Sequence, residues 1–140
     1  MGSKRQKGIS QENGKFSTLS IIQVNLDVTI DLEGGCLNYK EDVIPLTRKE
    51  HQVLSILVQR RQISSWGYCR VEDMVKQIYP KDSEVVDKPG AIQETIYRLR
   101  KKFAMIPGCD QIIESRPGWG YRLRISNITN QTTLQNLDEM

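Results

Sequence analysis

One stretch of the sequence, residues 91–103, constrains the fold more than any other. Its apolar side chains recur at the spacing of a helix and form one stripe: Ile92, Ile96, Leu99 and Phe103. A helix with such a stripe must bury it against a core, and its opposite side then faces water. That opposite side carries Glu94, Tyr97, Arg98 and Lys101. A helix that buries one face and presents cations on the other fits the major groove of duplex DNA.

The positive charge of the chain is concentrated around this helix. The whole sequence of 140 residues has a formal net charge of only +3. Residues 88–124 contain 8 basic and 3 acidic side chains, a net +5, whereas residues 16–87 contain 8 basic and 11 acidic side chains, a net −3. A local excess of cations of this kind is what a phosphate-binding surface requires.

The sequence disfavours metal sites and enzymatic activity. Cys36, Cys69 and Cys109 are far apart, and the single histidine, His51, has no metal-ligating partner nearby in the sequence. We therefore expect reduced, mostly structural cysteines, a structural histidine and no metal. No nucleophile–base pair, paired-carboxylate site or glycine-rich phosphate loop is visible, so we expect no catalytic residues and no cofactor.

The expected location is cytoplasmic, at the nucleoid when the protein is bound to DNA. No run of residues approaches the roughly 18 apolar residues of a membrane span, so no membrane partner is expected. The basic N-terminus lacks the apolar segment of a secretory signal.

The chain divides into a tail, one domain and a second tail. Residues 1–16 are polar and basic and predict a disordered tail, and residues 126–140 predict a polar C-terminal tail. Residues 17–125 predict a single domain. Its first part, up to residue 46, alternates apolar and polar residues, which indicates a small antiparallel sheet of three or four strands. The first strand is expected to include Leu26, with a register change near Ile21–Ile22.

Two helices are expected before the basic one. Thr47 and Glu50 have the spacing of a capping box, so a helix is predicted to begin there and to run to about Arg61. A shorter helix is predicted from residue 71 to Tyr79, because Pro80 cannot continue it. The acidic connection over residues 80–90 is long for a helix-turn-helix link.

The chain after the basic helix has the pattern of a β-hairpin. Pro117–Gly118 has the order of a type II turn, since proline fixes φ at the second position and glycine accepts a positive φ at the third. Apolar residues alternate around this turn over residues 112–124. Arg116 then lies near the tip, and Tyr121 and Leu123 are expected to point to the core.

This order of elements resembles the winged-helix DNA-binding domain of OmpR/PhoB-type transcription regulators, including the ToxR/CadC-like branch. Three motifs within residues 18–125 carry the resemblance: Leu46-Thr47-x-x-Glu50-x-x-Val53-Leu54, then Arg98-Leu99-Arg100-Lys101-Lys102, then Arg116-Pro117-Gly118-Trp119-Gly120-Tyr121. The resemblance implies an α+β winged helix-turn-helix fold with a small N-terminal antiparallel sheet, three helices and a C-terminal β-hairpin wing. It also implies a bacterial, phosphorelay-related protein that binds DNA and regulates transcription.

Some features depart from the family pattern. His51 stands where the family commonly has an aromatic residue. Pro117 aligns with a wing arginine of some members, so Arg116 is expected to take that role. We also expect the domain to stand alone, without the receiver domain of a response regulator, and we infer no switching by aspartyl phosphorylation.

The resemblance and the charges together assign three groups of site residues. The base-reading group is Glu94, Thr95, Tyr97 and Arg98, and the phosphate-binding group is Arg100, Lys101, Lys102 and Arg122. The wing group is Ser115, Arg116 and Trp119. Arg98 is the best candidate for a bidentate contact to guanine, and Arg116 is expected in the adjacent minor groove. The wing arginines are expected on the same side as the basic helix, and Trp119 either packs under the wing or lies on the sugar-phosphate backbone.

Two functions remain open at this stage. The first is sequence-specific binding of double-stranded DNA by a transcription regulator, as a dimer or as tandem copies on direct repeats. The alternative is a winged-helix adaptor that contacts a protein such as RNA polymerase through residues 80–90, without specific DNA readout.

Overall fold

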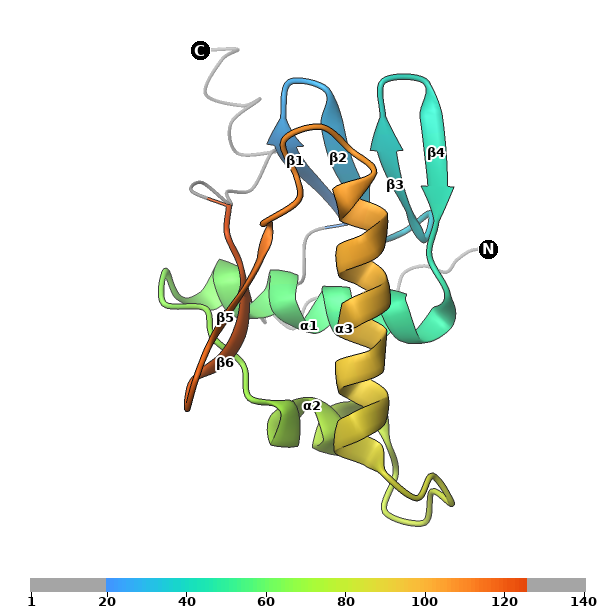
Figure 1. Ribbon diagram of the computed structural model, residues 1–140, viewed down its shortest axis with the longest axis vertical. Helices are drawn as coiled ribbons and strands as arrows, with labels where there is room; N and C mark the ends of the chain where they lie inside the picture. Colours follow the sequence, from blue (N-terminus) through green and yellow to red (C-terminus); the bar gives the residue numbers. More distant parts are fainter. Residues whose placement is uncertain (1–19, 126–140) are drawn as a thin grey trace, which may run out of the picture.

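The computed structural model describes residues 20–125 (Figure 1). The predicted tails at residues 1–16 and 126–140 lie outside the described residues, as does the start of the predicted domain. The chain forms β1 (Ile21–Asn25), β2 (Val28–Asp31), β3 (Cys36–Tyr39), β4 (Asp42–Pro45), α1 (Arg48–Ile63), α2 (Val71–Ile78), α3 (Lys88–Ala104), β5 (Ile113–Arg116) and β6 (Gly120–Leu123). This order confirms the predicted α+β winged helix-turn-helix architecture.

The first four strands form an antiparallel sheet in the order β1-β2-β3-β4. Alternation along the strands places one set of apolar side chains on the buried face, among them Ile22, Ile30 and Leu37. The sheet therefore has one face in the core and one toward solvent, as its alternating sequence predicts.

The first strand ends earlier than the sequence predicts. The register change lies between Gln23 and Asn25 instead of at Ile21–Ile22. Leu26 is in the turn after β1 and is almost fully exposed. The Asn25 side chain accepts a hydrogen bond from the backbone N–H of Asp27 at 2.9 Å, and this local bond favours a turn over a longer strand.

The predicted capping box at the start of α1 is confirmed. Thr47 Oγ1 accepts from the Glu50 N–H at 3.2 Å, and Glu50 Oε1 accepts from the Thr47 N–H at 2.8 Å. The helix continues two residues past Arg61 to Ile63. Arg60 and Arg61 lie in its last turn, where cations complement the negative end of the helix dipole.

The second helix ends before Pro80, as predicted, and α3 begins three residues earlier than predicted, at Lys88. The Asp87 side chain caps α3 by accepting from the Gly90 N–H at 3.0 Å. Pro89 lies in the first turn, where a helix needs no backbone N–H, so this proline helps to start the helix.

One hydrophobic core joins the sheet, the helices and the hairpin. The apolar stripe predicted for α3 is buried, since Ile92, Ile96, Leu99 and Phe103 are each at most 1% exposed. In Figure 1 the C-terminal end of α3 lies beside the sheet, and its N-terminal end lies beside α2. The buried stripe therefore fixes which side of α3 faces solvent.

The β5–β6 hairpin, here called the wing, is closed by the predicted turn. The Trp119 N–H donates to the Arg116 carbonyl at 2.9 Å, and Gly118 has a φ of +82°, which fits a type II turn. Along β6 the wing pairs with the loop before α2. The Cys69 N–H donates to the Tyr121 carbonyl at 2.8 Å, and the Tyr121 N–H donates to the Cys69 carbonyl at 3.0 Å.

Candidate nucleic-acid interface

The solvent side of α3 forms a narrow strip of polar and charged side chains. This surface, here called the α3 strip, consists of Gln93, Glu94, Tyr97, Arg98 and Lys101. All five residues are exposed, and they repeat at helical spacing opposite the buried stripe. The strip includes three of the four predicted base-reading residues.

The charged side chains of the α3 strip contact their neighbours on the helix. Arg98 Nη2 lies 3.4 Å from Glu94 Oε2, one turn earlier. Lys101 Nζ lies 5.4 Å from the centre of the Tyr97 ring, within the range of a cation–π contact. An exposed helical ion pair contributes only about 0.3–0.5 kcal/mol. These contacts therefore orient the cations but are weak enough to be exchanged for contacts with a ligand.

Thr95, the fourth predicted base-reading residue, is buried. It is 3% exposed, and its Oγ1 donates to the Ala91 carbonyl at 2.9 Å. Thr95 follows Ile92 by three residues and therefore shares its inward face of the helix. The prediction is corrected accordingly, because Thr95 has no access to DNA from this position.

Lys102, a predicted phosphate-binding residue, joins α3 to α1 and to β4. Its Nζ donates to Glu50 Oε1 at 2.5 Å and to the Pro45 carbonyl at 2.8 Å. Glu50 is 1% exposed, and a buried carboxylate of this kind requires a partner cation. Lys102 therefore has a structural role, which makes it a weaker candidate for phosphate binding than Lys101.

Arg100 and Arg122 also have acceptors within the protein. The Nε and Nη2 of Arg100 donate to the Ile113 carbonyl at 3.3 and 3.0 Å. Arg122 Nε donates to Glu114 Oε1 at 2.9 Å, and its Nη1 donates to the Trp66 carbonyl at 3.0 Å. Both arginines thus have acceptors that connect them to the wing or its neighbouring loop, and their phosphate contacts stay a prediction.

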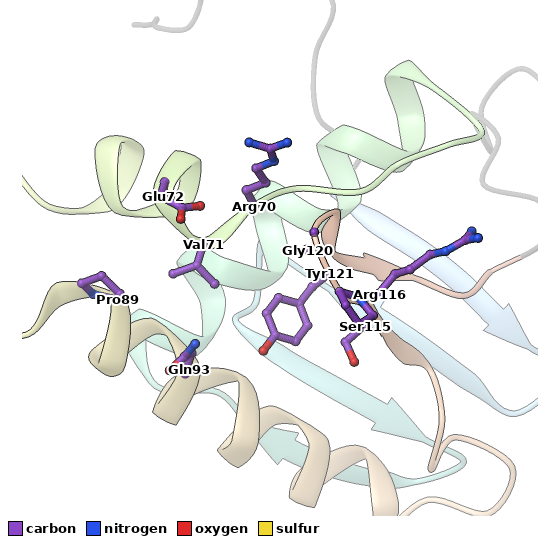
Figure 2. A pocket seen from close by; sticks show the side chains of 11 residues that line it. Arg70, Val71, Glu72, Pro89, Gln93, Ser115, Arg116, Gly120 and Tyr121 are labelled. Carbon is purple, nitrogen blue, oxygen red and sulfur yellow. The ribbon is translucent and has the colours of Figure 1, made fainter.

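The two faces of the wing carry different side chains. Ser115 lies opposite Tyr121 and Glu114 opposite Arg122 in the strand register, and directly opposed residues project to the same face. Figure 2 shows Ser115 and Tyr121 on the side toward α3 and Arg116 pointing away from it. In the structure, therefore, the Arg116 side chain points away from α3, and the register places Arg122 on the face opposite to that of Ser115 and Tyr121.

Aromatic rings support the tip of the wing. The ring centres of Trp119 and Trp66 are 4.0 Å apart, and Tyr68 approaches both rings edge-on at 5.4 and 5.3 Å. The guanidinium carbon of Arg116 lies 3.5 Å from the centre of the Trp119 ring. Trp119 is half-buried and packs against Trp66, and its predicted contact with the sugar-phosphate backbone stays a prediction.

A groove of about 620 Å³ separates the wing from α3 (Figure 2). Its lining includes Pro89 and Gln93 of α3, Ser115 and Tyr121 of the wing, and Arg70, Val71 and Glu72 at the start of α2. Gln93 and Arg70 are not among the predicted site residues. Gln93 precedes Tyr97 by four residues, so helical spacing indicates its exposure, whereas no periodic pattern identifies Arg70 in its loop.

The histidine and the three cysteines, which are the remaining candidate metal ligands, have contacts typical of structural residues. His51 is half-buried, and its Nε2 lies 2.6 Å from the Leu32 carbonyl, which joins α1 to the end of β2. Cys36, Cys69 and Cys109 are free thiols, and burial is the main cause that raises the pKa of each. Within residues 20–125, no group of three or more potential ligands could hold a metal ion, and no helix has the length and apolarity to span a bilayer.

Comparison with known families identifies a match over the greater part of the chain. Residues 40–123 match the family described as "Transcriptional regulatory protein, C terminal". This range extends from the end of β3 through the helices to the end of β6. Among curated proteins, no sequence matches the chain.

Solved structures of low sequence identity share the fold. The DNA-binding domain of CadC from E. coli has a TM-score of 0.59 and 14% identity, with 78% of this chain and 95% of that chain covered. The response regulator DrrB from Thermotoga maritima, an OmpR/PhoB homologue, has a TM-score of 0.56 and 23% identity, with coverages of 74% and 44%.

A third structure, from a family of streptococcal redox sensors that evolved from two-component response regulators, has a TM-score of 0.57 and 21% identity, with coverages of 79% and 44%. This chain therefore spans less than half of the DrrB chain and of the streptococcal chain. At these identities the similarity shows the winged helix-turn-helix fold alone.

Proposed function

The chain belongs to the family of transcriptional regulatory proteins defined by their C-terminal domain, and from this membership we propose that it binds double-stranded DNA and reads its sequence. In the proposed complex, α3 lies in the major groove and the tip of the wing lies at the adjacent minor groove. The bound chain then acts in the regulation of transcription.

The α3 strip is the observation that carries this proposal. It presents a guanidinium, an ammonium, an amide, a carboxylate and a phenol on one exposed helix face. These are the groups that recognise base edges and phosphates in a major groove. The groove between α3 and the wing lies next to the strip, and it offers space for the sugar-phosphate backbone that must pass between a recognition helix and a wing.

Base reading is assigned to four residues of the strip. Arg98 is suited to the O6 and N7 of guanine, and Gln93 to the N6 and N7 of adenine. Glu94 can accept from cytosine N4, and Tyr97 can contact a base edge or a thymine methyl. The ion pair of Arg98 with Glu94 does not prevent this, because it contributes about 0.3–0.5 kcal/mol and a good bidentate base contact about 1–3 kcal/mol.

Phosphate binding is assigned to Lys101 and Arg70. Lys101 is exposed, and no carboxylate holds it among the described contacts. Arg70 is exposed beside the start of α2, at the border of the groove. Arg116 is assigned to the minor groove, where narrow A·T tracts attract cations.

Selection of bound duplexes from a random library tests the proposal. We expect enrichment of one short motif at moderate salt, and a change of that motif when Arg98→Ala is selected in parallel. Spacing between repeated motifs among the selected duplexes also distinguishes a single copy from tandem copies on direct repeats. A selection that enriches no motif at moderate salt would argue against sequence reading.

The adaptor function is the second candidate, and the connection between α2 and α3 supports it. Val85 and Val86 are both exposed there, although both are apolar. Exposed apolar side chains in a loop are suited to a protein partner such as RNA polymerase. Failure to bind any duplex, independent of salt, together with binding of polymerase that Val86→Asp abolishes, would favour this candidate.

A further inference from the structure

We propose that Trp66, in the loop between α1 and α2, is a positioning residue that sets the orientation of Arg116 for DNA through the ring of Trp119. This inference rests on the proposed function of the wing. It adds a residue outside the helix and outside the wing to the surface that determines DNA binding.

The contacts form a continuous series from the loop to the wing tip. The Trp66 and Trp119 ring centres are 4.0 Å apart at an interplanar angle of 46°, and Arg116 lies 3.5 Å above the Trp119 ring. Arg116 ends β5, and Trp119 precedes β6, so the two residues border the turn. Trp119 is therefore the shared contact of the loop and the arginine.

Packing in the hydrophobic core does not explain the position of the Trp66 side chain. Its side chain is 50% exposed, and it is not part of the buried core, whereas the neighbouring Tyr68 is 6% exposed. The described ring contacts of Trp66 go to Tyr68 and Trp119. Half of a large aromatic surface thus stays in water while the other half supports the wing.

The backbone holds Trp66 at a fixed distance from the wing. Two hydrogen bonds pair Cys69 with Tyr121, and Arg122 donates from the wing to the Trp66 carbonyl at 3.0 Å. The guanidinium of Arg122 also lies 4.5 Å from the centre of the Tyr68 ring. The loop and the wing are therefore joined by hydrogen bonds both at Trp66 and at Cys69.

A fixed arginine binds better than a mobile one. Immobilising a long side chain and a turn on binding costs conformational entropy, and an orientation that already exists in the free protein reduces this cost. The Trp119 ring holds the flat face of the guanidinium, which leaves its N–H edges available as donors. Loss of the Trp66 ring is expected to make the Trp119 side chain more mobile, and the Arg116 side chain that packs on it becomes more mobile as a consequence.

A double-mutant cycle tests this coupling in the full chain. The cycle consists of Trp66→Ala, Arg116→Gln and the double variant, with affinity measured on a duplex from the selection. We expect Trp66→Ala to lose about fivefold in affinity and Arg116→Gln about tenfold, with the double variant equal to Arg116→Gln alone. Ile63→Ala is the matched control, because Ile63 is an exposed apolar residue at the same end of α1.

Two further readouts separate positioning from a general loss of structure. Trp66 lies outside the buried core, so the free energy of unfolding of Trp66→Ala is expected to stay close to the wild-type value. The chain has 2 tryptophans, and both lie in this cluster, so fluorescence of a Trp66→Phe variant reports on Trp119 alone. We expect a change of that fluorescence on DNA binding, and near wild-type affinity because phenylalanine retains a ring.

The outcomes distinguish this inference from the proposed function. Wild-type protein that binds no duplex overturns both. Wild-type binding that Arg116→Gln weakens but Trp66→Ala does not overturns the positioning role alone. Losses that multiply in the double variant also overturn it, since Trp66 then acts independently of Arg116.

Discussion

The Nζ of Lys102 lies 2.5 Å from the Oε1 of Glu50, and the same carboxylate oxygen accepts from the Thr47 N–H at 2.8 Å. One buried carboxylate thus caps α1 and also holds the last turn of α3. Because Lys102 donates to the Pro45 carbonyl as well, three elements meet at a single ammonium group. The orientation of the α3 strip therefore depends on a contact on the opposite side of the helix.

Lys102→Ala is expected to destabilise the fold. The variant leaves the Glu50 carboxylate buried without its cation, and breaking a buried pair costs about 3–5 kcal/mol. We expect a loss toward the lower end of this range, because the Lys102 side chain is 25% exposed. Urea unfolding measures the change. Lys101→Ala, which removes an exposed neighbour, is the control and should leave stability within about 0.5 kcal/mol of wild type.

Arg98→Ala is expected to weaken specific binding and to relax sequence preference at one position. The expected loss is about 1–3 kcal/mol, since a bidentate contact to guanine is removed. Competition binding with duplexes that vary at each position measures both quantities. Equal affinity and an unchanged preference would remove Arg98 from the base readers.

Lys101→Ala is expected to weaken binding to all sequences and to reduce the magnitude of the salt slope by about 1. Lys102 is adjacent and carries the same charge, but its ammonium is already paired with Glu50. A Lys102→Met variant, measured at a temperature where it is folded, should therefore keep most of the wild-type salt slope. Titrations at several salt concentrations measure the slopes. Equal changes in the two variants would contradict the division between free and paired cations.

Gly120→Ala is expected to disrupt the wing, whereas Gly118→Ala is expected to be tolerated better. A Cβ at Gly120 would lie 2.1 Å from the Cys69 carbonyl oxygen, and Gly120 has a φ of +104°. A Cβ at Gly118 meets open space, so only the positive φ opposes it, at a cost of about 1–2 kcal/mol. Thermal unfolding should rank wild type above Gly118→Ala and Gly118→Ala above Gly120→Ala.

The reactivity of the three thiols is expected to decrease as their burial increases. Cys36 is half-buried on the sheet, whereas Cys69 and Cys109 are at most 1% exposed. Burial raises the pKa of all three thiols, so little reactive thiolate is present near neutral pH. Labelling with a thiol reagent in the folded protein should modify Cys36 first and the other two at the rate of unfolding. Faster labelling of Cys69 would show that the loop beside the wing opens.

Local patterns predict much of the fold because short-range chemistry decides it. Thr47 and Glu50 form the capping box that their spacing predicts, and Pro117–Gly118 forms its turn. The predicted start of α3 lies three residues too late because Pro89–Gly90 is typical of a loop, although proline also suits a first helical turn. The prediction that the first strand includes Leu26 is wrong. Apolarity alone favours a strand there, whereas the hydrogen bond of the Asn25 side chain favours a turn.

The site residues are predicted less well, since a side chain's partner depends on tertiary packing. Thr95 and Lys102 follow Ile92 and Leu99 by three residues, so periodicity already places both near the buried face. No pattern shows that a carboxylate on α1 would lie within reach of Lys102. The face of the wing that meets α3 likewise depends on how the hairpin docks, which alternation along the strands does not determine.

The narrow α3 strip limits how much sequence a single copy can distinguish. From Gln93 to Lys101 the helix rises about 12 Å, at about 1.5 Å per residue. Even if it lay parallel to the duplex axis, this length would cover only about four base pairs, each rising about 3.4 Å along the duplex. A sequence of about four base pairs recurs by chance about once in 256 positions, and a genome offers about a million competing sites or more. One copy would thus encounter thousands of chance matches in a genome. A unique binding site therefore requires a second recognition sequence at a fixed distance from the first.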